Sequence, residues 1–95
     1  MERVFLTDAG RHQWFDRSAV EERWETVLGG FTYRLFLTRL GAWVCEKIGP
    51  KSLHQVNLIT APEAFQMLQQ TFKVCDSLSP GLRQRIQDEV GRFEV

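Results

Sequence analysis

The sequence predicts a small α+β domain, in which a mostly antiparallel sheet of four or five strands carries two C-terminal helices packed on one face. Three observations predict this fold. Residues 31–48 are dense in Tyr, Phe, Thr, Trp and Val, which favour strands. Gly41 interrupts this stretch where a hairpin loop needs a left-handed residue. Two amphipathic helical patterns follow the strands without the strand–helix alternation of a parallel sheet. We therefore expect a sheet of two hairpins plus one strand.

The first hairpin is predicted from residues 4–7 and their return strand, residues 11–15. Residues 5–10 and 36–41 share the pattern FLTxxG, so both hairpins are expected to use the same type of loop. A three-residue loop places Trp14 opposite Val4. Downstream, Ser18 and Glu21 match a capping box, which predicts a two-turn helix over residues 19–25. An irregular connection is the alternative there, with residues 26–28 extending the sheet.

The central hairpin has two unequal faces. If residues 39–41 form the loop, Arg34 lies opposite Glu46 and Phe36 lies opposite Val44. Alternation then gives one nearly apolar face, which is expected to be the core side and contains Phe31, Tyr33, Leu35, Leu37, Trp43 and Cys45. The opposite face, here called the mixed face, carries an apolar centre flanked by an Arg/Glu pair and contains Arg34, Phe36, Val44, Glu46 and Ile48.

The C-terminal part is predicted from a strand and two helix starts. Residues 54–59 are half polar on both faces, which suits a strand at the sheet edge or a short antiparallel neighbour. Thr60 and Glu63 form a second capping box, and apolar residues recur after it at helical spacing as far as Cys75. Ser79 begins a last helix that has Leu82, Ile86, Val90 and Phe93 on one side.

Length and composition place the chain among small globular proteins. Ninety-five residues, 43% apolar and 25% charged, predict one domain spanning residues 1–95 with a single core. Twelve acidic and twelve basic residues cancel, which removes the usual charge of a nucleic-acid binder. We expect no membrane association, because no apolar stretch is long enough for a membrane span or a signal peptide. A cytoplasmic location with Cys45 and Cys75 as free thiols is therefore expected.

No pattern in the sequence indicates catalysis. His12 and His54 are the only imidazoles, and neither stands in a recognisable relation to a nucleophile or an oxyanion loop. Two Cys and two His at unhelpful spacings do not form a zinc site. We therefore expect no catalytic residues, no metal, no cofactor and no small-molecule substrate.

The mixed face is the predicted functional surface, because an apolar centre with a polar rim is the usual anatomy of an interface. It predicts a non-catalytic protein-binding module, such as a regulator, an inhibitor or an assembly adaptor, in the style of a bacterial or mobile-element accessory protein. The partner is another protein or a second copy. The predicted partner-binding residues are Arg34, Phe36, Val44, Glu46, Ile48 and Trp14.

Two alternatives stay open at this point. In the first alternative, the first hairpin or a helix covers the mixed face, so that the mixed face is a second core inside the monomer. Otherwise the protein is a nucleic-acid-binding regulator, which uses the central sheet or the arginines of the last helix. Residues 31–60 carry four bases and one acid, and Arg83, Arg85 and Arg92 lie in the last helix. Asp88 and Glu89 beside these arginines weaken the nucleic-acid alternative.

Overall fold

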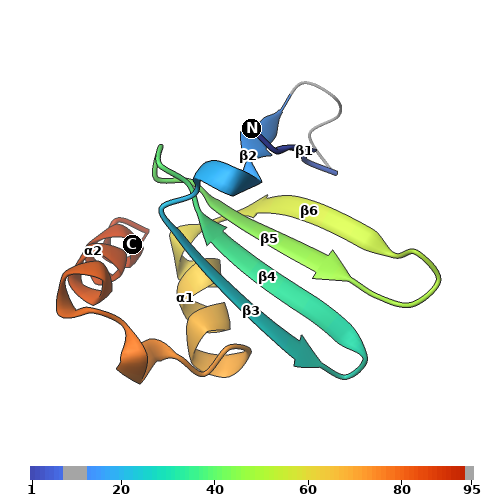
Figure 1. The fold of residues 1–95 in the computed structure, drawn as a ribbon. Helices are drawn as coiled ribbons and strands as arrows, with labels where there is room; N and C mark the ends of the chain where they lie inside the picture. The colour runs from blue at the N-terminus through green and yellow to red at the C-terminus, as the bar shows by residue number, and fades with distance from the viewer. Residues whose placement is uncertain (8–12, 94–95) are drawn as a thin grey trace. The chain divides into compact units, whose positions relative to one another are not determined.

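The computed structural model describes residues 1–7 and 13–93, and the chain divides into two compact units, residues 1–59 and 60–95 (Figure 1). The first unit holds a four-stranded antiparallel sheet and a separate two-stranded hairpin. The second unit holds two helices that pack against each other. The α+β class is thus confirmed, whereas a single domain with the helices on one sheet face stays a prediction. None of the described helices is long and apolar enough to cross a bilayer.

The four-stranded sheet follows chain order. Its strands are β3 (Glu22–Leu28), β4 (Phe31–Leu37), β5 (Trp43–Ile48) and β6 (His54–Ile59), arranged β3-β4-β5-β6. The predicted register of the central hairpin is confirmed, because Arg34 pairs with Glu46 and Phe36 with Val44. Gly41 has a φ of 84° in the connecting loop, a conformation that suits glycine. The expected edge position of β6 is confirmed as well.

The first hairpin consists of β1 (Arg3–Phe5) and β2 (Trp14–Asp16), and its predicted register is wrong by one residue. Trp14 pairs with Phe5 rather than with Val4, and Val4 pairs with Phe15. The predicted turn at residues 8–10 lies outside the described residues. Because side chains alternate along a strand, this shift decides which of the two aromatic residues points inward. Phe15 is buried, and Trp14 is exposed.

The predicted helix over residues 19–25 is wrong. Residues Arg17–Ala19 form a short 3-10 turn that Asp16 caps, since its carboxylate accepts a hydrogen bond of 3.1 Å from the Ser18 N–H. The chain then enters β3, where Trp24 pairs with Leu35 and stacks on Trp43 at a centroid distance of 6.0 Å. The capping pattern involves only a few neighbouring residues. Strand pairing and the aromatic contact with residues farther along the chain thus override it.

The first hairpin packs over part of the mixed face. Five buried side chains from both layers form one cluster, namely Leu6, Phe15, Phe36, Val44 and Val56. The ring centroids of Phe15 and Phe36 lie 5.1 Å apart. Thr7 fixes the hairpin to β6, because its N–H donates to the Val56 carbonyl at 2.6 Å and its hydroxyl accepts from the Val56 N–H at 2.8 Å. This part of the mixed face is therefore an internal core of the first unit.

The second unit begins where the sequence predicts. Helix α1 (Ala61–Gln70) starts at Thr60, whose side chain and that of Glu63 complete a capping box. A 3-10 turn, η3 (Cys75–Ser77), leads to helix α2 (Pro80–Gly91). Ser79 caps α2, since its hydroxyl accepts a hydrogen bond of 3.3 Å from the Leu82 N–H. Both predicted helix starts are confirmed.

Candidate functional site

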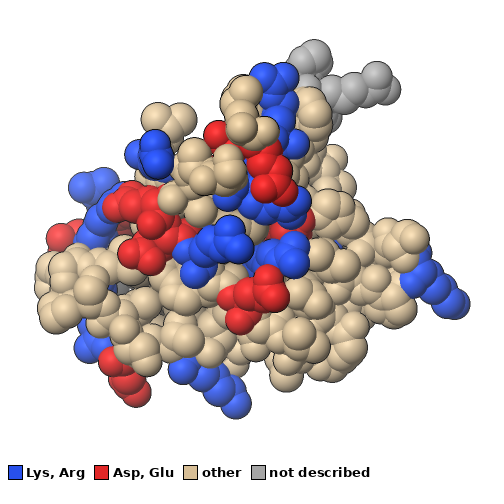
Figure 2. Space-filling view, in the orientation of Figure 1, with Lys and Arg blue, Asp and Glu red and all other residues tan. Residues whose placement is uncertain are grey.

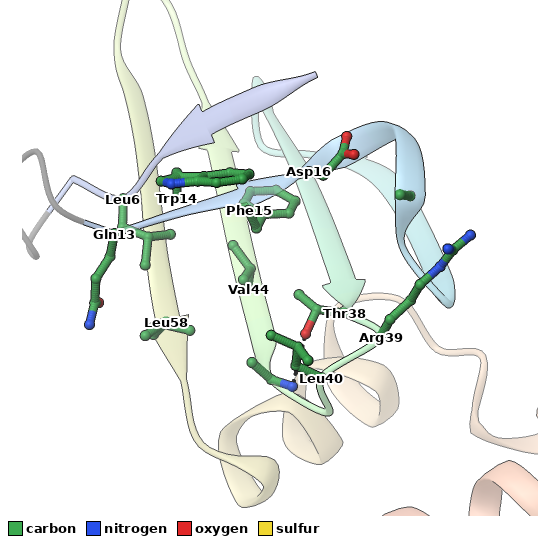
Figure 3. A pocket seen from close by; sticks show the side chains of 12 residues that line it. Leu6, Gln13, Trp14, Phe15, Asp16, Thr38, Arg39, Leu40, Val44 and Leu58 are labelled. Carbon is green, nitrogen blue, oxygen red and sulfur yellow. Dashed lines mark hydrogen bonds between the residues drawn. The ribbon is translucent and has the colours of Figure 1, made fainter. Parts of the chain in front are cut away.

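An open groove lies in the first unit between β2, the β4–β5 loop and β6 (Figure 3). Its volume is about 530 Å³. The side chains that line it are Leu6, Gln13, Trp14, Phe15, Asp16, Ala19, Thr38, Arg39, Leu40, Ala42, Val44 and Leu58. Most of them are apolar, so removing the surface of the groove from water would be energetically favourable.

The groove has a buried part and an exposed part. Leu6, Phe15 and Val44 belong to the core below the hairpin. Large apolar side chains on the outer side remain in water: Leu58 is 49% exposed and Leu40 is 97% exposed. A single exposed apolar residue is ordinary, but several around one hollow indicate an interaction site.

The β4–β5 loop holds Leu40 away from the sheet. The Thr38 N–H donates to the Ala42 carbonyl at 2.9 Å, and the Ala42 N–H donates to the Thr38 hydroxyl at 3.0 Å (Figure 3). The Gly41 N–H also donates to the Thr38 carbonyl at 3.0 Å. These hydrogen bonds fix the loop backbone, so Leu40 is presented from a defined turn.

Trp14 forms the hairpin side of the groove. It lies beside Phe5 on the outward face of the hairpin and is 43% exposed. The guanidinium of Arg3 sits 4.3 Å from the centre of its ring. Such a cation–π contact contributes about 0.5–1 kcal/mol at an exposed site. The indole is thus oriented by its neighbour while part of its surface stays accessible.

Polar side chains occupy the ends of the groove. Asp16 accepts hydrogen bonds from the Glu2 N–H at 2.9 Å and from the Ser18 hydroxyl at 2.6 Å. These bonds, with the one to Ser18 the stronger, lower the pKa of Asp16. Arg39 is exposed on the loop opposite, and Gln13 is exposed next to β2. The groove therefore has an apolar centre and a polar rim.

A buried carboxylate marks a second feature of the mixed face. Glu46 is 1% exposed, and its oxygens accept hydrogen bonds from Arg17 at 3.1 Å and from Arg34 at 3.2 Å. His54 Nε2 lies 2.6 Å from the same carboxylate. Arg17 also pairs with Glu2, and Arg34 pairs with Glu25, so the cluster alternates in sign.

The cluster keeps Glu46 ionised. Burial raises the pKa of this carboxyl, because it removes water from the charged form. Hydrogen bonds from His54 and Arg34 and the charges of Arg17 and Arg34 lower it by more. The pKa of Glu46 consequently lies below its ordinary value of 4.5. Arg17 belongs to the first hairpin's end, so the cluster also helps to hold that hairpin on the sheet.

The six predicted partner-binding residues do not form one surface. Phe36 and Val44 lie in the core under the hairpin, and Glu46 is buried among cations. Arg34 is partly exposed beside Glu46, whereas Ile48 is half-buried at the other end of β5. Of the six, Trp14 and Val44 line the groove, Trp14 from the outer face of the hairpin and Val44 from the sheet. Partner binding by the six residues stays a prediction, and Phe36, Val44 and Glu46 are each only 1% exposed.

Sequence reasoning missed the groove itself. Leu6, Phe15, Leu40 and Leu58 lie on four separate segments, and only the hairpin's position over the sheet brings them together. One feature of the sequence could have pointed to it, namely Leu40, an apolar residue inside a predicted loop. His12, the other histidine of the sequence, lies outside the described residues. Among the described residues, no three His, Cys, Asp or Glu side chains are grouped to hold a metal ion.

Comparison with known proteins adds no relative. No family model, no curated protein and no solved structure gave a significant match to the chain. The groove and its surroundings are therefore the features from which a function can be inferred.

Proposed function

We propose that this protein is a non-catalytic protein-binding module, and that the groove between β2, the β4–β5 loop and β6 receives an apolar side chain or short segment of a partner protein. The observation that carries the proposal is the apolar centre of the groove with the exposed side chains of Leu40, Leu58 and Trp14 around it. An apolar centre with aromatic side chains and a polar rim is typical of protein interfaces. A regulator, an inhibitor or an assembly adaptor would use such a surface.

The charged groups near the groove support binding rather than catalysis. An acid–base mechanism needs titratable groups that converge on a reacting atom. The carboxylate of Asp16 is instead committed to capping the turn after β2, and Arg39 lies across the groove on the loop. Glu46 and His54 contact each other within the ion-pair cluster. Asp16, Glu46 and His54 thus have structural partners, which favours a role in recognition over catalysis.

The nucleic-acid alternative is weaker for a similar reason. Arg17 and Arg34, two cations of the first unit, are paired with Glu46, Glu2 and Glu25. Figure 2 shows Lys and Arg side chains interspersed with Asp and Glu side chains on the face in view. Phosphate binding would require an uninterrupted basic surface and would weaken steeply with salt. Binding through the apolar groove is expected to change little with salt.

Site-specific crosslinking tests the proposal. A photoreactive amino acid at position 40, in the groove, is expected to crosslink to one partner protein in cells of the native host. The same amino acid at position 51, in the exposed β5–β6 turn, serves as the matched control and is expected to give no such product. Introducing Leu58→Glu alongside the crosslinker at position 40 should abolish the product. Equal crosslinking from positions 40 and 51, or crosslinking unaffected by Leu58→Glu, would contradict the proposal.

A further inference from the structure

The outer side of β3 is a second surface available for interaction. β3 lies at one edge of the four-stranded sheet, and within residues 1–7 and 13–93 no strand pairs with its outer side. The opposite edge differs, because Thr7 hydrogen-bonds to Val56 of β6. An uncovered strand edge presents unpaired N–H and C=O groups to which another strand can bind.

β3 lacks several features that normally protect an edge. It is seven residues long and contains neither proline nor glycine. Val27 is 69% exposed and Leu28 is 55% exposed, so the strand also leaves apolar side chains in water. Short length, proline, β-bulges and charged side chains are the usual means of preventing edge pairing. What β3 does carry is charge, at Glu22, Arg23 and Glu25.

The backbone geometry shows which residues point outward. Gly29 and Gly30 have φ values of 60° and 82° and form the turn from β3 to β4, with Leu28 paired to Phe31. In such a two-residue hairpin the closing pair is hydrogen-bonded, and the hydrogen-bonded positions alternate along the strand. The backbone groups of Arg23, Glu25 and Val27 therefore point away from β4.

Charge selects one register for pairing with a second copy. In an antiparallel pair of strands related by a twofold axis, one residue faces its own copy across that axis. We call this residue the one on the axis. With Trp24 on the axis, Arg23 of each copy faces Glu25 of the other. With Glu25 or Arg23 on the axis, like charges face each other, which destabilises a strand pair. A shift to Thr26 places Glu25 opposite Val27 and gains no ion pair.

The side chains needed for this register are accessible. Arg23 is exposed and forms no ion pair with any residue that the structure describes. The Glu25 side chain is 54% exposed, and it uses Oε2 to accept a hydrogen bond of 2.6 Å from Arg34 Nε. Oε1 of Glu25 is left for a second cation. On the other face of β3, Trp24 is half-buried and stacked on Trp43, so the axis would bring two indoles together.

We infer that the protein forms a homodimer in which β3 pairs antiparallel with β3 of a second copy, with Trp24 on the twofold axis and two reciprocal Arg23–Glu25 ion pairs. The two sheets join into one eight-stranded sheet. This dimer does not depend on the proposed function, because its surface is the outer edge of β3 and not the groove.

Sedimentation velocity over a wide range of concentration tests the inference with charge reversals. The wild-type protein is expected to change from monomer to dimer as its concentration rises. Arg23→Glu and Glu25→Arg should each raise the dissociation constant by roughly tenfold or more, because each variant sets like charges opposite one another twice. An equimolar mixture of the two variants should regain dimerisation, since every facing pair is then again of opposite sign. The double variant R23E/E25R should dimerise alone.

Glu22→Arg is the matched control, because Glu22 faces Thr26 of the second copy in this register. It is expected to dimerise like the wild type. Glu25→Arg also removes the contact with Arg34, so circular dichroism should be recorded for every variant, and Arg23→Glu avoids this complication. A wild-type protein that stays monomeric, or single variants that dimerise as well as the wild type, would overturn the inference. A mixture that fails to regain dimerisation would overturn the register.

Discussion

Replacing Phe15 with alanine tests whether the first hairpin is held by its packing on the sheet. Phe15 is buried, and its ring lies 5.1 Å from that of Phe36. Removing a buried phenylalanine side chain typically costs about 3–5 kcal/mol, which includes the cavity that is left behind. Thr7 and Arg17 also anchor the hairpin, so we expect the loss at the lower end of this range. We therefore expect Phe15→Ala to lower the free energy of unfolding by about 3 kcal/mol.

Trp14→Ala is the matched control, because Trp14 is the next residue and points to the opposite side of the hairpin. Trp14 is partly exposed, so its removal should cost about 1 kcal/mol or less. Urea unfolding followed by far-ultraviolet circular dichroism measures both variants on the same basis. Equal losses for the two variants, or a larger loss for Trp14→Ala, would refute the hairpin register and the core beneath it.

The remaining predictions concern Glu46 and the turn glycine. Glu46→Gln should cost about 1–3 kcal/mol at neutral pH, because Arg17 and Arg34 lose an ionised acceptor. Since the folded pKa of Glu46 is lowered, the wild-type advantage should be complete above 4.5 and disappear as pH falls through that lowered value, as measured by urea unfolding at several pH values. An advantage that is independent of pH would contradict this. Gly41→Ala should cost about 1–2 kcal/mol in thermal or urea unfolding, because alanine is strained at a φ of 84°. Gly81→Ala in α2, where no such φ occurs and space is open, should cost nothing, and equal effects would contradict the turn assignment.

Those elements that begin or end at a characteristic turn or capping residue could be predicted from the sequence. The central hairpin was predictable to the residue, because Gly41 defines the loop and the loop defines the pairs Arg34–Glu46 and Phe36–Val44. The starts of α1 and α2 were predictable from Thr60 and Ser79, whose caps act within one helical turn.

The errors came from contacts that a short window does not contain. Residues 18–25 carry a capping pattern and an i, i+4 apolar pair, but Trp24 gains more by pairing with Leu35 and stacking on Trp43. The predicted register of the first hairpin was wrong by one residue, because it took the loop length of the second hairpin. That single residue decides whether Phe15 or Trp14 is buried.

The candidate site was predictable only in part. The sequence indicated an unusual mixed face, and Trp14 and Val44 from the predicted set do line the groove. The location of the groove depends on how far the hairpin extends over the sheet, which the sequence does not specify. Phe36 illustrates this: on the strand alone it is the centre of an exposed apolar patch, and under Phe15 it is core.

The most direct test is to measure how tightly the partner identified by crosslinking binds two variants. Each variant replaces one exposed apolar side chain with glutamate. Leu40→Glu changes the groove, and Phe93→Glu changes an equally apolar exposed side chain after α2. Leu40→Glu is expected to lose binding by at least roughly tenfold while its circular dichroism is unchanged, and Phe93→Glu is expected to bind like the wild type. Wild-type affinity in Leu40→Glu, or an equal loss in both variants, would contradict the assignment of the groove as the protein-binding site.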